Sequence, residues 1–162
     1  MILPETREAL QEIGKGITAE ARYLLDTRKA NASKTLREGL RYWITERKFG
    51  ITLNVGARGP SAKYVIYADK GRGPGKMPPI DKIETWVKIK PVKLRNLKTG
   101  KFEKRTPQKI RSVAFLIARK IGREGSEGSD FYTDAFKAWQ PEIDAVKGII
   151  KADIKARIRR PR

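Results

Sequence analysis

The sequence predicts an α+β fold in which a small antiparallel β-sheet is flanked by an N-terminal helix and C-terminal helices, with extended loops. Apolar residues recur every three or four positions near both ends of the chain, which is the spacing of amphipathic helices. Between these regions, residues 40–69 are rich in β-branched and aromatic side chains, which favour strands. Glycine and proline separate the periodic segments, as is typical of turns.

The first predicted element is a helix over residues 5–28. Its apolar face consists of Leu10, Ile13, Ile17, Ala21, Leu24 and Leu25. Three strands are predicted next, with the sequences RYWIT, GITLNVG and KYVIYAD, and each connection between them contains glycine. We therefore expect a three-stranded antiparallel meander that ends at Asp69.

Two helices are predicted in the middle of the chain. The first covers residues 80–90 and follows Pro79, a residue that suits a helix start because the first N–H groups of a helix have no intrahelical partner. The second covers residues 106–122. There, Thr106 has the side chain of an N-cap, and Gly122 is expected to stop the helix.

A last helix is predicted to begin near residue 131, with Ser129 or Asp130 as its N-cap. Its apolar pattern continues to Ile154, but Pro141 interrupts the pattern, so we expect a kink or a break into two helices there. With 162 residues, the chain has the usual length of one domain, and we expect a single domain over residues 1–162.

The composition excludes several kinds of chemistry. The chain has no cysteine and no histidine, which removes disulfides, thiol nucleophiles and the commonest general base. It has 37 Lys and Arg residues against 18 Asp and Glu residues, and the formal charge of +19 favours an anionic partner. No apolar run approaches the roughly 20 residues needed to cross a bilayer, and the first residues do not match a signal peptide. We expect a soluble, unsecreted protein without a membrane partner.

Basic residues gather in two segments. Residues 91–106 are expected to form a basic hairpin or loop extension, and residues 155–162 a basic tail. The candidate basic contact surface consists of Lys93, Arg95, Lys98, Lys101, Lys104 and Arg105. Phe102 is the one aromatic residue beside them, so the segment lacks the interleaved platform that stacks single-stranded bases. It is either a solvated charge run or a surface for DNA phosphates or an acidic subunit.

The segment GRGPGKMPP, residues 71–79, contains a Gly-Lys pair that invites comparison with a phosphate-binding loop. Such a loop needs a glycine five residues before that pair and Ser or Thr directly after it, but Lys70 and Met77 occupy these positions. Its three prolines also remove amide donors. We therefore predict a rigid connection from strand to helix, and no bound cofactor.

Acidic residues form two weak metal-site patterns. Glu46 and Lys48, with Asp26 earlier in the chain, superficially match the carboxylates and lysine of a metal-dependent nuclease. Asp130 and Asp134 lie one helical turn apart. Solvent-facing charge and helix capping explain the two patterns better. We therefore predict no catalytic, cofactor-binding or metal-binding residue and no enzymatic activity, with a nuclease as the weakest alternative.

Two stretches carry a resemblance to a known family. They are YVIYADKGRGPGKMPPIDKIETWVKIK, residues 64–90, and RSVAFLIARKIGREGSEGSDFYTDAF, residues 111–136. Together they resemble the small neck proteins of tailed bacteriophages, also called head-to-tail joining or tail-completion proteins. The matching features are an apolar strand that runs into a Gly-rich loop, the MPP-I-x-x-I-x-x-W helix, the SVAFLIARKI helix and the aromatic-acidic FYTDAF segment.

The resemblance implies a structural virion protein of the neck, made in the host cytoplasm and without enzymatic activity. Such a protein forms a ring of six or twelve subunits between the portal or connector and the tail tube, as tail-completion and tail-terminator proteins do, and DNA passes through its lumen. By analogy, the loop over residues 70–79 and the basic hairpin contact neighbouring subunits. The candidate contact residues are Tyr67, Lys70, Gly71, Arg72, Gly73, Pro74, Gly75, Lys76 and Met77.

The charge of the chain leaves two arrangements open. Because DNA must slide through the lumen, cations that face inward would hold it too tightly. Either the cations face acidic neighbours, or the excess lies in tails that contact the portal, the tube or packaged DNA. The alternative function is a basic nucleic-acid-binding module that uses the hairpin and the tail.

Overall fold

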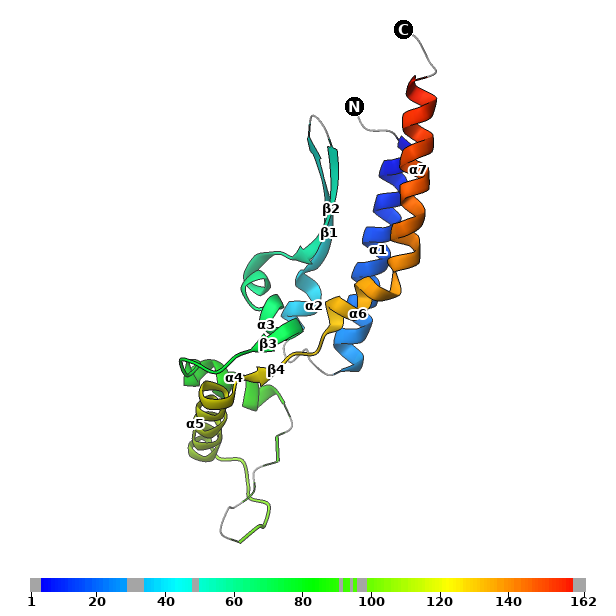
Figure 1. Ribbon diagram of the computed structural model, residues 1–162. Helices are drawn as coiled ribbons and strands as arrows, with labels where there is room; N and C mark the ends of the chain where they lie inside the picture. The colour runs from blue at the N-terminus through cyan, green and yellow to red at the C-terminus, as the bar shows by residue number, and fades with distance from the viewer. Residues whose placement is uncertain are drawn as a thin grey trace. The chain divides into compact units, whose positions relative to one another are not determined.

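The computed structural model describes residues 4–28, 34–47, 50–90, 92–93, 95 and 99–158, and it divides into two compact units (Figure 1). Unit 1 comprises Met1–Asn31, Thr35–Asp69 and Ser129–Arg162. Unit 2 comprises Ala32–Lys34 and Lys70–Gly128.

The predicted α+β class is confirmed, because helices are combined with small antiparallel sheets. The single domain expected from the length of the chain stays a prediction. No helix of the described ranges is long and apolar enough to span a membrane.

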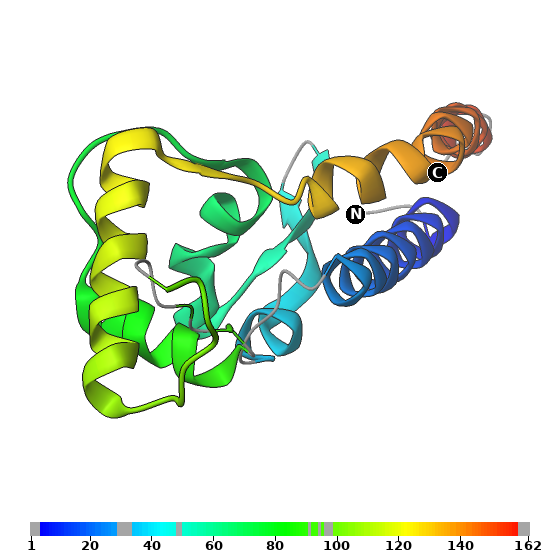
Figure 2. The same ribbon diagram turned by 90° about the horizontal axis from the view of Figure 1, so that it is seen from below.

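Unit 1 is built around long helices and one hairpin. Its elements are α1 (Pro4–Thr27), α2 (Thr35–Gly39), β1 (Leu40–Arg47), β2 (Gly50–Ala57), the 3-10 helix η1 (Gly59–Lys63), α3 (Val65–Lys70), α6 (Phe131–Ala138) and α7 (Gln140–Ile158). α3 ends where unit 1 passes into unit 2. Figures 1 and 2 show α7 alongside α1, in agreement with the packing of these helices.

The core of unit 1 confirms the apolar face predicted for the first helix. Four α1 residues of that face are buried together with residues of β1, α6 and α7, and the cluster comprises Ile13, Ile17, Ala21, Leu25, Leu40, Phe131, Ala135 and Val146. Two glycines on α1 let neighbouring rings come close to its backbone. A Cβ at Gly14 would lie 2.6 Å from the Tyr42 ring, and one at Gly16 would overlap the Trp139 ring.

The hairpin of β1 and β2 confirms the first two predicted strands. They pair antiparallel, with Leu40 opposite Ala57 and Arg47 opposite Gly50. The third predicted strand, KYVIYAD, is wrong, because these residues form the end of η1 and most of α3. Val65, Ala68 and Asp69 are its less exposed positions, at a spacing of three and four that suits a helix. Tertiary contacts have therefore overridden the β-propensity of this segment.

Asp69 on α3 and Asp153 on α7 supply carboxylates to the N-termini of other helices. Asp69 Oδ1 accepts a hydrogen bond from the Tyr132 amide of α6 (2.7 Å). Asp153 Oδ2 accepts from the Thr6 amide (3.1 Å) and from Thr6 Oγ1 (2.6 Å) at the start of α1. A carboxylate at these positions satisfies amides that have no intrahelical partner and complements the helix dipole.

The caps predicted for the last helix are corrected by this arrangement. Asp130 occupies the N-cap position of α6, but its side chain makes no capping hydrogen bond, and Asp69 provides the carboxylate instead. The side chain of Ser129 donates to Ala68 O. Burial raises the pKa of the Tyr132 phenol above its ordinary value, and the negative charge of Asp69 raises it further.

The predicted break near Pro141 is confirmed, because α6 ends before Trp139 and α7 begins at Gln140.

Unit 2 is a helical pair with a short two-stranded sheet. Its elements are β3 (Gly71–Arg72), α4 (Ile80–Ile89), α5 (Pro107–Glu124) and β4 (Ser126–Glu127). α4 and α5 pack on each other around buried Val87, Ile110 and Ala114. The helix predicted over residues 80–90 is confirmed, and Pro91 lies outside the described residues.

The two ends predicted for α5 had different outcomes. The N-cap is confirmed, because Thr106 Oγ1 accepts a hydrogen bond from the Lys109 amide (3.3 Å). The stop at Gly122 is wrong, because the helix continues to Glu124 and Gly125 forms its C-cap with φ 80°. A glycine in the left-handed region ends a helix more readily than one inside the last turn.

Candidate partner-binding surface

The loop over residues 70–79 is attached at two points to the segment at the end of α5. In the sheet of β3 and β4, Gly71 pairs with Glu127 and Arg72 with Ser126. Further along, the Gly75 amide donates a hydrogen bond to the Gly122 carbonyl (2.8 Å). The loop leads from α3 into α4, and not from the predicted strand.

Two glycines allow the backbones of this attachment to come close. Gly71 has φ 77°, and a Cβ there would overlap the Ser126 carbonyl oxygen. Gly125 has φ 80°, and a Cβ there would overlap the Arg72 carbonyl oxygen. L-residues rarely adopt these φ values, and no side chain fits in the remaining space. These glycines therefore fix a backbone contact.

The polar groups of the loop bind its own backbone and that of α5. Arg72 Nη2 donates a hydrogen bond to the Lys76 carbonyl. The Gly75 amide, which a phosphate cradle would direct at an anion, is bound to Gly122. The arrangement therefore gives no support to a phosphate-binding loop. Gly73, Pro74, Gly75, Lys76 and Met77 are exposed, so this part of the loop is presented to solvent.

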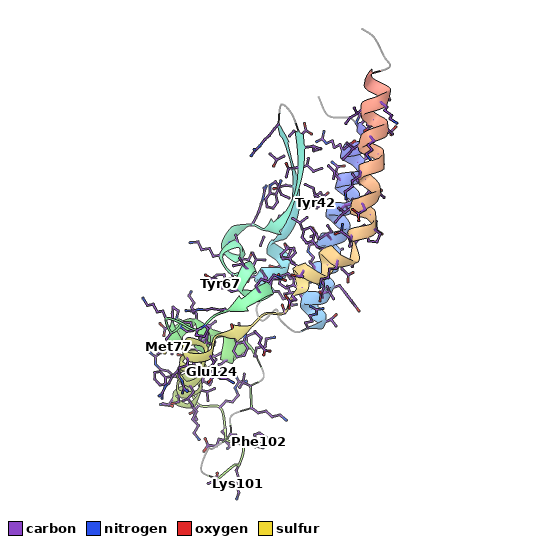
Figure 3. All side chains as sticks on the ribbon, viewed as in Figure 1. Tyr42, Tyr67, Met77, Lys101, Phe102 and Glu124 are labelled. Atoms are coloured by element: carbon purple, nitrogen blue, oxygen red, sulfur yellow. The ribbon has the colours of Figure 1, made fainter. Side chains whose placement is uncertain are left out.

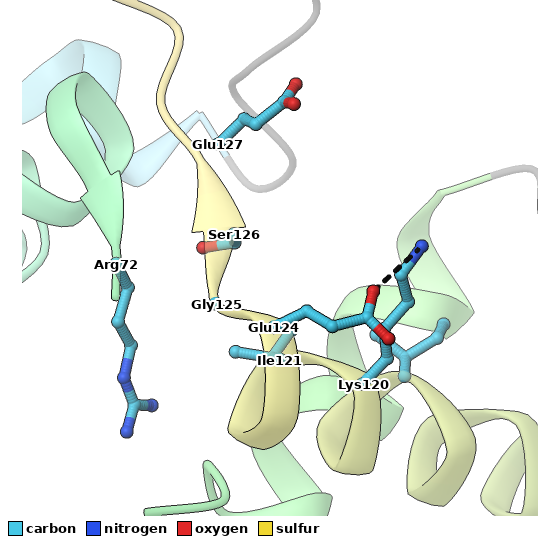
Figure 4. Close-up of a pocket in the computed structure, with 8 residues that line it drawn as sticks. Arg72, Lys120, Ile121, Glu124, Gly125, Ser126 and Glu127 are labelled. Atoms are coloured by element: carbon cyan, nitrogen blue, oxygen red, sulfur yellow. Dashed lines mark ion pairs between the residues drawn. The ribbon is translucent and has the colours of Figure 1, made fainter. Parts of the chain in front are cut away.

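A cavity of about 560 Å³ lies beside the attachment (Figure 4). Its lining includes the cations Arg72 and Lys120 and the acids Glu124 and Glu127. Lys120 Nζ and Glu124 Oε2 lie 3.8 Å apart, one turn from each other on α5. Because both signs of charge line the cavity, it suits the mixed surface of a protein better than a phosphate.

An apolar groove on unit 2 was missed by the sequence analysis. It has a volume of about 500 Å³ and is lined by Ile80, Gln108, Arg111, Ser112, Phe115 and Leu116. Phe115 and Leu116 are exposed on α5, and neither belongs to the cluster that α5 forms with α4. The signal was present in the segment SVAFLIA, where apolar residues extend beyond the single stripe that one buried face requires.

Tyr67 belongs to a second exposed apolar group, in unit 1. Tyr64, Ile66 and Tyr67 are each more than half exposed at the start of α3. Lys70, the other predicted contact residue of α3, lies at its C-terminal end, and its side chain is exposed as well. A run of large exposed apolar side chains is typical of a surface that a partner covers.

The basic segment of unit 2 contains an antiparallel bridge between Arg95 and Phe102, as a hairpin requires. Lys93 and Arg95 place their charged groups over the Phe102 ring, at 5.5 Å and 5.2 Å from its centroid. Lys101 and Phe102 are exposed near the far end of the segment (Figure 3). Lys98 lies outside the described residues.

Arg105 differs from the other predicted basic contact residues. Its guanidinium donates hydrogen bonds to the carbonyls of Val87, Lys88 and Lys90 at the C-terminal end of α4. These carbonyls have no intrahelical partner, and a cation there complements the helix dipole. Arg105 is exposed, as Lys101 and Lys104 are, but its hydrogen bonds stabilise the end of α4.

Three of the four carboxylates in the two metal-site patterns bind cations of the chain itself. Asp26 pairs with Arg37 (2.6 Å), Glu46 with Arg7 (3.7 Å) and Asp134 with Arg28 (2.6 Å). The hydrogen bond from Arg28 holds the pKa of Asp134 below its usual value. In the part of the chain that the structure describes, no cluster of three acidic residues is arranged to hold a metal ion.

Comparison with protein-family models, curated proteins and solved structures found no match to this chain.

Proposed function

We propose that this chain is a structural subunit of the neck of a tailed bacteriophage. In this proposal it forms a ring of six or twelve copies between the portal or connector and the tail tube, and DNA passes through the lumen. The chain completes the junction of head and tail and catalyses no reaction.

The observation that carries the proposal is the contact between the two stretches that resemble neck proteins. They are distant in sequence, yet they contact each other within each unit. In unit 1, the Ser129 amide donates to Ala68 O (3.0 Å), and the Asp130 amide to Asp69 O (2.8 Å). In unit 2, β3 pairs with β4. The residues of the resemblance thus form connected structure, as expected if the whole pattern is inherited together.

Exposed apolar side chains give the proposal further support. In unit 2, the exposed apolar side chains include Met77, Trp86, Phe115 and Leu116. In unit 1, Tyr64, Ile66 and Tyr67 are exposed at the start of α3. Isolated exposed apolar residues are normal, but neighbouring groups of them favour an assembly in which other subunits cover them.

A stop codon in the gene tests the proposal in the phage that encodes the chain. We expect such a phage to make filled heads and complete tails that fail to join, with joining restored when the chain is supplied from a plasmid. Electron microscopy of the lysate gives the readout. Normal infectious virions without the chain would rule out a neck function.

Nucleic-acid binding by the basic segment is a second candidate function. It is favoured by exposed Lys93, Arg95, Lys101 and Lys104, while the single acid among them, Glu103, pairs with Lys109 (2.8 Å). This function predicts duplex binding that weakens steeply with salt, and a smaller salt dependence when Lys93, Arg95, Lys98 and Lys101 are changed to Gln. Undetectable binding at low ionic strength would remove it.

A further inference from the structure

Two patches of opposite charge lie in successive halves of α1. The acidic patch consists of Glu5, Glu8 and Glu12, whose spacing of three and four places them on one side of the helix. The basic groove begins one turn later and is lined by Lys15, Thr18, Ala19, Arg22, Arg41 and Tyr42. Glu12 and Arg22 are ten residues apart, or about 15 Å along the helix axis.

The basic groove has a volume of about 440 Å³ and three cationic side chains in its lining, with no acid. Arg22 is held in place by a hydrogen bond from Nη2 to Leu40 O (2.6 Å). Arg22 Nε is buried and has no hydrogen-bond partner among the described residues. Lys15 and Arg41 are exposed and form no ion pair within the described ranges. The groove therefore offers unpaired positive charge to an anionic group.

The carboxylates of the acidic patch are also without partners. Asp26, Asp134 and Asp153 of unit 1, in contrast, bind cations or cap a helix. None of the patch carboxylates has a hydrogen bond or ion pair to any described residue. Like charges at this helical spacing repel each other. Glu5, Glu8 and Glu12 therefore gather three unpaired negative charges on one face of α1, in a chain whose formal charge is +19.

We propose that the basic groove of one copy binds the acidic patch of a second copy. This contact rests on the proposed ring function and identifies one subunit interface of the ring. Because the patch and the groove are different surfaces, each copy can bind one neighbour through its patch and another through its groove, which is the heterologous contact that builds a ring.

A second copy fits the groove better than a nucleic acid does. Three carboxylates match three cations, and their helical spacing presents them as a row. A phosphate backbone laid across the groove would pass beside the acidic patch of the same helix and be repelled by it. DNA would also leave the unpaired acids without a role. Because both patches are exposed, we expect assembly to weaken as salt screens them.

Charge reversal of the full-length chain tests the contact. The patch variant is E8K/E12K, and the groove variant is K15E/R41E, which keeps Arg22 because that residue binds Leu40 O. We expect each variant alone to self-associate at least tenfold more weakly than the wild type, measured by mass photometry and sedimentation velocity. An equimolar mixture of the two should assemble again, because the reversed patch fits the reversed groove.

Matched controls change the same charge elsewhere on unit 1. E38K/E142K and K63E/K151E alter exposed residues that have no ion pair among the described residues, and we expect them to assemble as the wild type does. Circular dichroism checks that all variants are folded. Wild-type assembly by both single variants, or a mixture that fails to assemble, overturns the contact.

The remaining outcomes separate this contact from DNA binding by the same groove. If the groove serves DNA, the groove variant loses duplex binding while the patch variant assembles normally, and the proposal is wrong. A wild-type chain that stays monomeric at every concentration also overturns it. The proposed function fails separately, when the stop-codon phage still joins heads to tails.

Discussion

Unit 1 and unit 2 differ in how they bury their side chains. Among the largest fully buried side chains of the described residues, Phe131, Ile17, Leu25 and Leu40 belong to unit 1, and Val87 belongs to unit 2. Unit 1 also has carboxylates that cap helices from other elements. Unit 2 instead presents the attached loop and the basic segment. Unit 1 therefore holds most of the buried core, whereas the attached loop and the basic segment are features of unit 2.

The strongest test of the buried core of unit 1 is Phe131→Ala. Phe131 is fully buried, so we expect the change to lower the free energy of unfolding by about 3 to 5 kcal/mol. Urea unfolding followed by circular dichroism measures this loss. Phe136→Ala is the matched control, because Phe136 lies on the same helix but is 40% exposed. We expect this change to lower the free energy of unfolding much less than Phe131→Ala does. Equal losses would contradict the assigned core.

Asp153→Ala tests the carboxylate caps. The change removes the acceptor of the Thr6 amide and leaves that donor unsatisfied in a buried place, at an expected cost of about 1 to 3 kcal/mol. Asp144→Ala on the same helix is the control. Asp144 forms an exposed pair with Lys147, which is worth at most about 1 kcal/mol. A smaller loss for Asp153→Ala than for the control would refute the cap.

Gly71→Ala tests the attached loop against Gly59→Ala. The two glycines have similar φ values, 77° and 73°, but a Cβ at Gly59 would meet nothing within 4 Å. We expect Gly71→Ala to lower the free energy of unfolding by about 1 to 2 kcal/mol more than Gly59→Ala does, because the Cβ at position 71 overlaps the Ser126 backbone. Hydrogen exchange should be faster at residues 71–72 and 126–127. The attachment is wrong if both variants behave alike.

The smallest expected effect is the pH dependence of the Arg28–Asp134 pair. Because the pKa of Asp134 is lowered in the folded chain, the pair stabilises the fold above the ordinary Asp pKa of about 3.9 and loses this contribution as the pH falls through the lowered value. The difference in Tm between the wild type and Asp134→Asn should thus be present at neutral pH and vanish in acid. A difference in Tm that grows as the pH falls would contradict the lowered pKa of Asp134.

Much of the fold follows from local sequence patterns. The apolar spacing on α1, the Thr106 cap and the break near Pro141 each depend on residues close together in the chain, and all three are confirmed. The helix over residues 65–70 was missed because its conformation depends on α6, more than sixty residues away. The Asp153 cap depends on a still more distant contact, with Thr6.

The candidate surface was predictable in part. The glycines and prolines of residues 71–79 indicated a special loop, but its attachment to the end of α5 depends on a partner segment that local pattern does not identify. Composition grouped Arg105 with its basic neighbours, although its guanidinium binds the carbonyls of α4. The basic groove on α1 was also missed, because Arg41 reaches it from another element.

Cryo-electron microscopy of the virion neck tests the proposed function most directly. The proposed function predicts a closed ring of six or twelve copies between portal and tail, with density that fits α1, α6 and α7 in every copy. Virions whose neck contains no density for this chain would contradict it.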